Sequence, residues 1–189
     1  MQTIAERAGV NKALLHYYFR SKDKLYESVL SEMMTKLWTA LQGNLPAMEN
    51  LGHDLRTLLR VFISTFITML RANPDFPRMF LRELADGFQT TPRVVEQTIN
   101  SMGNLPERIF GAISAGIGRR EVKPIEPPHI IFNIIGMCAS TFILQPMFGV
   151  MYQKVMRTEM KLDEEFYQKR IDAIVEMVCE GIFLREKQS

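Results

Sequence analysis

The stretch Thr3–Leu25 reads TIAERAGVNKALLHYYFRSKDKL and predicts two short helices joined by a tight turn, followed by the start of a third helix. Gly9 allows the positive φ that such a turn requires, and apolar residues recur at helical spacing on both sides of it. Five residues can fill the angle between the two helices: Ile4, Ala5, Ala8, Val10 and Leu15. This arrangement is typical of a helix-turn-helix unit, whose second helix can enter the major groove of DNA.

Residue types that commonly cap helices precede each of these segments. We expect caps at Thr3, Asn11 and Ser21, because their side-chain oxygens can accept from the free N–H groups of a first turn. The third helix should continue through Leu25 to Gly43, since its apolar residues keep the helical period.

Lysine and arginine residues concentrate around this turn. From Arg7 to Lys24 there is a single acid, Asp23, against Arg7, Lys12, Arg20, Lys22 and Lys24, whereas the whole chain has a net charge of only +2. A local excess of positive charge suits contact with phosphates. Taken alone, without a sequence motif, this excess of positive charge fits an ordinary solvated face equally well.

The motif is more specific, because the stretch resembles the DNA-binding region of the TetR family of bacterial transcriptional regulators. The residues that stand at positions of that family's pattern are Ile4, Ala5, Ala8, Gly9, Val10, Leu15, Phe19, Lys22 and Leu25. By this resemblance, the residues that face base edges or sugars are Lys12, Ala13, Tyr17 and Tyr18, and those that hold phosphates are Thr3, His16 and Lys22.

Two positions depart from the family's pattern. His16 stands where the family usually has Tyr, and Leu14 stands where it often has Thr. An imidazole can still donate to a phosphate, and its charge would then depend on pH near neutrality. His16 is therefore either a phosphate contact or a substitution tolerated on a polar face.

The family also has a helix before the position of Thr3, and only Met1 and Gln2 precede it in this chain. Without that helix, part of the apolar surface of the head would lack its cover. We expect either that Met1 is not the true start or that a leading segment is missing. The alternative is a natural truncation that has lost DNA binding, and the codons upstream of Met1 would decide.

The remainder of the chain predicts further helices, and the fold class is all-α. We expect a DNA-binding head with its connecting helix at 1–43 and a ligand-binding and dimerisation body at 44–189. After a linker at 44–52, helices are predicted over 55–70, from about 74, from about 92, and over 107–120, 128–153 and 163–186. The 55–70 helix is apolar on nearly all sides, so other helices should surround it.

The resemblance implies that this body forms a homodimer and binds a small molecule. The last two helices carry broad apolar stripes, and the residues expected at the dimer interface are Ile134, Phe148, Ile171, Ile174, Val178 and Ile182. That both stripes instead belong to the core of one chain stays open.

Phenylalanine and methionine residues in the body could line an apolar cavity for a small hydrophobic effector. The expected lining residues are Phe62, Phe66, Met69, Phe80, Phe110 and Met137, with Thr65, Asn133 and Thr141 to orient the ligand. Each of them could equally be plain core.

An enzyme is not indicated. The sequence has no nucleophile motif, no glycine-rich phosphate loop and no ligand set at metal spacing, so we expect no cofactor and no metal. Arg82 and Glu83 are interpreted as ordinary surface charges. Two isolated cysteines, Cys138 and Cys179, suit a reducing cytoplasm, and the apolar run 130–144 is too short to span a membrane.

These observations predict a ligand-responsive transcriptional regulator, a repressor, that leaves a palindromic double-stranded DNA operator when its effector binds. The 21–43 helix would be the lever, with Leu37, Trp38 and Leu41 facing the cavity and Lys22 at the DNA. The alternative is a helical dimer that binds only small molecules or another protein. An activator with the same fold is a third possibility.

Overall fold

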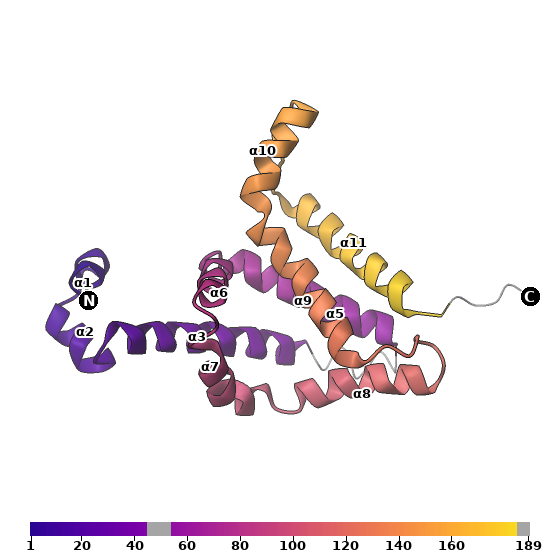
Figure 1. Ribbon diagram of the computed structural model, residues 1–189, viewed down its shortest axis with the longest axis horizontal. Helices are drawn as coiled ribbons and strands as arrows, with labels where there is room; N and C mark the ends of the chain where they lie inside the picture. Colours follow the sequence, from indigo (N-terminus) through magenta and orange to yellow (C-terminus); the bar gives the residue numbers. More distant parts are fainter. Residues whose placement is uncertain (45–53, 185–189) are drawn as a thin grey trace, which may run out of the picture.

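The computed structural model describes residues 1–44 and 54–184, which form α-helices, one 3₁₀ helix and one isolated β-bridge (Figure 1). The all-α prediction is confirmed. In chain order the elements are α1 (Gln2–Ala8), α2 (Lys12–Phe19), α3 (Lys22–Gly43), α5 (Leu55–Ala72), α6 (Asp75–Ala85), α7 (Thr91–Thr98), η1 (Ile99–Met102), α8 (Leu105–Gly118), α9 (Pro127–Ile143), α10 (Gln145–Met156) and α11 (Glu164–Ile182). Beyond Asn44, the predicted linker lies outside the described residues.

The head consists of α1, α2 and the first turn of α3. Gly9 ends α1 in the left-handed conformation, with φ 66°, as the turn requires. Asn11 caps α2 by accepting from the amide N of Ala13 at 2.7 Å, and Ser21 caps α3 by accepting from the amide N of Lys24 at 3.1 Å. The predicted cap at Thr3 is wrong, because α1 already begins at Gln2 and Thr3 lies within it.

Helix α3 joins the head to the body without a break. Its first turn lies against α2, and the helix then packs into the body against α5 and α7 (Figure 1). Its buried apolar residues follow a helical period and are Leu30, Met34, Leu37 and Leu41. The lever predicted from the sequence is therefore one continuous helix.

Helix α5 lies at the centre of the body, as its all-round apolar sequence predicted. It packs against α3, α8, α9 and α11. Its most enclosed side chains, Leu59, Ile63 and Ile67, are at most 1% exposed. A helix so enclosed fixes the positions of the helices around it.

The single helix predicted over 128–153 is wrong, because the chain breaks at Leu144 into α9 and α10, which are bent by 63°. Pro146 explains the break. It has no N–H to donate to the carbonyl of Phe142, and its ring would clash with that carbonyl in a continuous helix. The bend turns α10 away from the body as a projecting arm (Figure 1).

Helix α11 runs back along α5 and α9 and completes the core. The side chain of Arg170 joins it to α9 by donating to Thr141 Oγ1 at 2.9 Å and to the carbonyl of Met137 at 3.0 Å. The helix ends at Ile182 rather than at 186, because the chain there turns into the isolated bridge between Val122 and Phe183.

The predicted dimer residues need correction. Five of them are buried in the core of their own chain, at 7% exposed or less, and cannot reach a partner: Ile134, Ile171, Ile174, Val178 and Ile182. Phe148, on α10, is 48% exposed and stays available. For those five residues, the structure supports the alternative that the apolar stripes form an intramolecular core.

The prediction that Glu83 is a surface charge is also wrong, because this residue is buried. Its carboxylate Oε2 accepts from the amide N of Thr90 at 2.9 Å, the amide N of Thr91 at 2.7 Å and Thr91 Oγ1 at 2.9 Å. It thereby ties the end of α6 to the start of α7, where the helix dipole favours a negative charge. Burial alone would raise the pKa of Glu83, but these hydrogen bonds outweigh it and hold the pKa below its usual value.

Tyr26 of α3 lies beside this carboxylate. Burial, reinforced by the negative charge of Glu83, raises the pKa of Tyr26 to about 12. The Tyr26 hydroxyl also donates to the carbonyl of Met79 at 3.4 Å. Helices α3, α6 and α7 are therefore joined at one point, close to the head.

We expect Glu83→Gln to lower the free energy of unfolding by about 2 kcal/mol near pH 7, because an amide cannot accept three hydrogen bonds as the carboxylate does. The lowered pKa means that this contribution is fully present above the ordinary glutamate pKa of 4.5 and is lost as the pH falls through the folded-state value. Urea unfolding at several pH values measures both effects.

The matched control for this change is Glu96→Gln, on an exposed position of α7, which should cost less than about 0.5 kcal/mol. A Glu83→Gln variant as stable as the Glu96→Gln protein at pH 7 would contradict the role assigned to the buried carboxylate.

Candidate DNA-binding head and ligand cavity

The face of α2 opposite Leu15 is exposed to solvent. Every residue predicted to contact DNA is exposed: Thr3, Lys12, Ala13, His16, Tyr17, Tyr18 and Lys22. Leu15, on the inner side of α2, is buried, which leaves the predicted contacts on the outer side. The side chains are thus accessible to a macromolecule as large as a duplex.

Two neighbouring tyrosines dominate this surface. Tyr17 and Tyr18 are 66% and 68% exposed, with ring centroids 5.3 Å apart in an edge-to-face arrangement. The guanidinium of Arg20 lies 5.8 Å from the centroid of the Tyr17 ring. Large aromatic side chains exposed to this degree, with a cation beside them, suit contact with sugars and phosphates rather than a role in folding.

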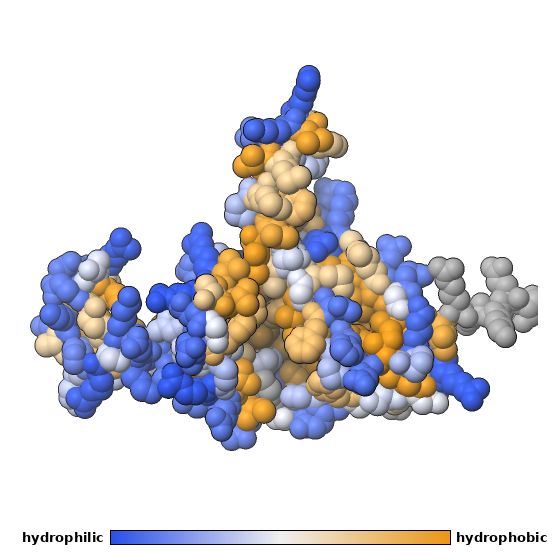
Figure 2. Space-filling view, viewed as in Figure 1, coloured by the Kyte–Doolittle hydropathy of each residue, from blue (hydrophilic) through white to orange (hydrophobic). Residues whose placement is uncertain are grey.

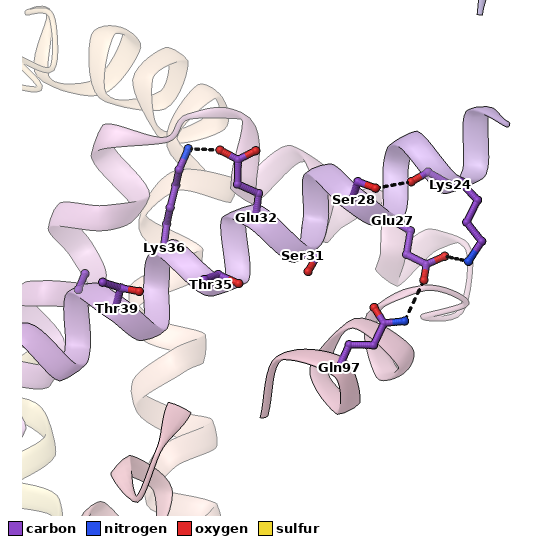
Figure 3. A pocket seen from close by; sticks show the side chains of 10 residues that line it. Lys24, Glu27, Ser28, Ser31, Glu32, Thr35, Lys36, Thr39 and Gln97 are labelled. Carbon is purple, nitrogen blue, oxygen red and sulfur yellow. Dashed lines mark hydrogen bonds and ion pairs between the residues drawn. The ribbon is translucent and has the colours of Figure 1, made fainter. Parts of the chain in front are cut away.

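Just behind the head, polar residues of α3 and Gln97 of α7 line an open groove (Figure 3). Glu27 accepts from Lys24 Nζ at 2.8 Å and from Gln97 Nε2 at 3.2 Å. The hydrogen bonds from Lys24 and then Gln97 hold the pKa of Glu27 below its usual value. A charged Glu27 therefore ties the head end of α3 to α7.

The body contains an apolar cavity of about 170 Å³ between α3, α5, α6 and α9. Its lining residues are Leu30, Met34, Leu37, Trp38, Leu41, Phe62, Phe66, Leu70, Phe76, Pro77, Phe80, Thr91, Ile135, Ala139 and Ile143. None carries a charge. The cavity therefore suits an uncharged, largely apolar ligand.

Three of the nine predicted ligand residues line this cavity, namely Phe62, Phe66 and Phe80. The six others do not lie there: Thr65 and Met69 border a separate open groove, Phe110 and Asn133 are exposed, and Met137 and Thr141 lie at Arg170. Helical periodicity shows which residues share a face but not which face borders a void, and this explains the misses.

Leu37, Trp38 and Leu41, which were expected to face a cavity, all lie in the lining of this one. Leu30 and Met34, which continue the same stripe of α3 toward the head, were not predicted. Their spacing from Leu37 was a usable signal, because residues three, four or seven positions apart share a helix face. Most of one cavity wall is thus built by the helix that carries the head.

The arm formed by α10 exposes apolar side chains along its length (Figure 2). It has no buried residue. Its exposed large apolar residues are Met147, Phe148, Val150, Met151, Tyr152, Val155 and Met156. A contiguous apolar surface of this kind usually marks a protein interaction site.

Within 1–44 and 54–184, no three His, Cys, Asp or Glu side chains gather as a metal site. No single helix in these ranges is long and apolar enough to cross a membrane, and only the bent pair α9 and α10 passes that test by length and composition.

Comparison with known proteins agrees with this architecture. Residues 1–29 match the family model described as bacterial regulatory proteins of the tetR family, and residues 33–185 match the model for the C-terminal region of YcdC-like proteins. The chain is 25% identical over 184 residues to the HTH-type transcriptional regulator RutR of Escherichia coli O157:H7, of strain K12 and of Shigella flexneri. These matches cover 96% of this chain and 80% of each RutR protein.

Solved structures support the fold. A candidate transcriptional regulator, SCO4942 from Streptomyces coelicolor, superimposes with a TM-score of 0.63 at 20% identity, over 95% of this chain and 84% of that one. A candidate transcription regulator from Lactobacillus plantarum gives a TM-score of 0.55 at 15% identity, over 97% and 87%. The relatives are DNA-binding transcriptional regulators, which confirms the prediction of a DNA-binding regulator, and this family does not consist of enzymes, as expected. This chain belongs to the TetR family of bacterial transcriptional regulators, with a C-terminal region of the YcdC-like type.

Proposed function

We propose that this chain is a ligand-responsive repressor that binds a palindromic double-stranded DNA operator as a homodimer. One observation carries the proposal: α3 begins beside the DNA-facing residues at Lys22 and lines the cavity through Leu37, Trp38 and Leu41. A ligand that fits one position of this wall better than another shifts the balance between two positions of the head.

The exposed face of α2 supports DNA binding through the major groove, which is wide enough for an α-helix. Lys12, Ala13 and Tyr17 are exposed on this helix and are proposed to face the bases. Lys22 and His16 are proposed to hold phosphates. A two-fold symmetric pair of such heads reads two half-sites of a palindrome.

Release by a small hydrophobic effector is supported by the composition of the cavity. Its lining includes Trp38 and four phenylalanines and has no charged side chain. The effector acts on the wall that α3 provides, and α6 and α7 transmit the change because Glu83 and Glu27 tie them to α3 and to each other. Binding of effector and of DNA are then coupled reciprocally.

The α10 arm supports dimerisation, which TetR regulators share. Its exposed Phe148, Met151 and Val155 would be covered by the same surface of a second copy in an isologous interface. This assignment replaces the five interface residues that the structure buries in the core.

Lys22→Ala tests the phosphate contact. We expect weaker binding to the operator and to its sequence variants. We also expect a shallower fall of log affinity with log salt concentration, by about one unit for each protomer, because a phosphate that loses its lysine contact keeps its counterion on the DNA. Fluorescence anisotropy with duplexes from the flanks of the protein's own gene, at several salt concentrations, measures both. Lys36→Ala, on the body end of the same helix, is the control and should leave the slope unchanged.

Tyr17→Ala tests contact with the bases or sugars. It should cost about 1–3 kcal/mol of binding to the operator and less on unrelated duplex. Equal losses on both duplexes would assign Tyr17 to the backbone instead. Wild-type protein that shows no salt-dependent binding to any flanking duplex would favour the alternative, a helical module that binds small molecules or another protein but not DNA.

The double change Met151→Glu and Val155→Glu tests the dimer. Charges on the arm of each copy would face each other and lose water on association, so we expect a monomer at concentrations where the wild type is a dimer. Sedimentation velocity measures the mass. Leu84→Glu changes an exposed apolar residue of α6 and should leave the dimer intact. A double variant that stays dimeric would exclude the arm as the interface.

The direction of regulation is proposed as repression. In a transcription assay with the operator placed at a promoter, added protein should lower transcript and effector should restore it. Protein that raises transcript would make the chain an activator with the same fold.

A further inference from the structure

The apolar cavity of the body has no polar atom on its surface. Its space of about 170 Å³ is bounded by apolar atoms alone. The two lining side chains that carry a polar atom keep it away from the cavity. Trp38 Nε1 is buried within the protein, and the Thr91 hydroxyl donates to Glu83 Oε2 at 2.9 Å. Nothing that residues 1–44 and 54–184 present on this surface can therefore donate or accept a hydrogen bond.

Water is a poor occupant of such a space. A buried water needs two to four polar partners, and the surface of the cavity has none among the residues that line it. An empty space is also unfavourable, because the atoms around a void lose the dispersion contacts that close packing gives. The core on the neighbouring face of α5 is well closed, with Leu59, Ile63 and Ile67 at most 1% exposed. A cavity kept beside such a core is suited to hold an apolar molecule.

The apolar surface discriminates against ligands with polar groups. A hydroxyl, amide or carboxylate that enters the cavity loses its hydrogen bonds to water and gains none in return. A hydrocarbon has no such bonds to lose. The wall thus selects for molecules without any hydrogen-bonding group, a requirement narrower than the absence of charge.

The size of the cavity and its aromatic walls narrow the class further. A volume of about 170 Å³ is close to that of an apolar protein cavity that holds one benzene molecule. Aromatic side chains form much of the lining, and the rings of Phe62 and Phe66 are stacked with centroids 6.3 Å apart. Rings pack well against rings in stacked and edge-to-face arrangements. The space therefore fits one aromatic ring with one or two methyl groups.

We propose that the cavity binds a single-ring aromatic hydrocarbon, of about the size of toluene, and that the effector of this protein belongs to this class. The inference rests on the proposed ligand response and names the class of ligand. Such a ligand has no polar contact through which to act. It acts on α3 through the volume that it occupies against Leu30, Met34 and Leu37. A larger ring that still fits therefore displaces the helix further, because close-packed walls do not compress.

Two probes of similar size test the polarity of the site. Toluene carries a methyl group where phenol carries a hydroxyl. We expect calorimetric titration of the full chain, without DNA, to give at least about tenfold tighter binding of toluene, because the phenol hydroxyl finds no partner. Phenol that binds as tightly as toluene would overturn the class of ligand, and binding of neither would overturn the site.

Ala139→Leu tests the location of the ligand. Ala139 lines the cavity from α9, so a larger side chain there fills part of the space. The affinity for toluene should fall at least about tenfold, because an overfilled cavity forces its walls apart. Ala173→Leu makes the same change at an exposed position of α11 and should leave the affinity within about twofold of wild type. An Ala139→Leu protein that binds toluene as the wild type does would overturn the location.

A second measurement needs no variant. Trp38 is the one tryptophan of the chain and lines the cavity, so ¹⁵N-labelled protein gives a single indole cross-peak from this wall. Toluene bound beside it should shift the peak, because the ring current of an aromatic molecule acts on nearby protons. Toluene that binds and leaves the peak in place would lie elsewhere, which overturns the proposal even if Ala139→Leu does not fold.

Operator binding separates this inference from the proposed function. Toluene that binds in preference to phenol, but leaves affinity for the operator unchanged at saturation, supports the binding site and contradicts the ligand response. If the response exists, saturating p-xylene should weaken operator binding more than saturating benzene, since it occupies more of the cavity. An equal or larger effect of benzene would overturn action by volume.

Discussion

The continuity of α3 is the constraint on which the rest of the molecule depends. A helix of 22 residues is about 33 Å long, enough to reach from the recognition surface into the middle of the body. Because α3 is one continuous helix from Lys22 to Gly43, it transmits a tilt instead of absorbing it. A small rotation about its buried end moves the distant head by a larger distance. The position of the head is therefore set by how the body packs around Leu30, Met34, Leu37 and Leu41.

Two carboxylates limit how that helix can move. Glu83 holds the start of α7 against the end of α6, and Glu27 holds α3 against the far end of α7. Both lie where the body meets the first half of α3, so they act on the part of the helix nearest the head. Apolar packing permits small sliding movements, whereas charge-assisted hydrogen bonds lose most of their energy when the geometry changes. The hydrogen bonds of Glu83 and Glu27 therefore favour movement of α3 between discrete positions over a continuous range of positions.

The head and the lever could be predicted from the sequence because their signals are local. Gly9, Asn11 and Ser21 act on backbone groups within a few residues of themselves, so their roles can be derived without knowing the fold. The break at Leu144 was foreseeable from Pro146 on the same grounds. The long apolar run from α9 into α10 favoured one uninterrupted helix and outweighed that signal.

The errors lie where a residue's environment depends on distant segments. Ile134 and Ile174 belong to apolar stripes that a second copy or the same chain could equally cover, and periodicity does not choose between the two. Glu83 has the same sequence signature as a solvated glutamate, and only the approach of Thr91 makes it a buried acceptor. The cavity is the extreme case. No local sequence pattern marks a void, because the void arises only when α3, α5, α6 and α9 pack together.

The α10 arm has a consequence for how the protein behaves inside a cell. A helix of 12 residues without a buried side chain is close to the limit at which isolated helices persist in water. Within one chain, little beyond its own backbone hydrogen bonds keeps it folded. With α10 as the proposed dimer interface, susceptibility of the arm to proteases should depend on the abundance of the protein, with dilute chains cut there first. The protein would then resist proteolysis only above a minimum concentration, whether or not an operator or effector is bound.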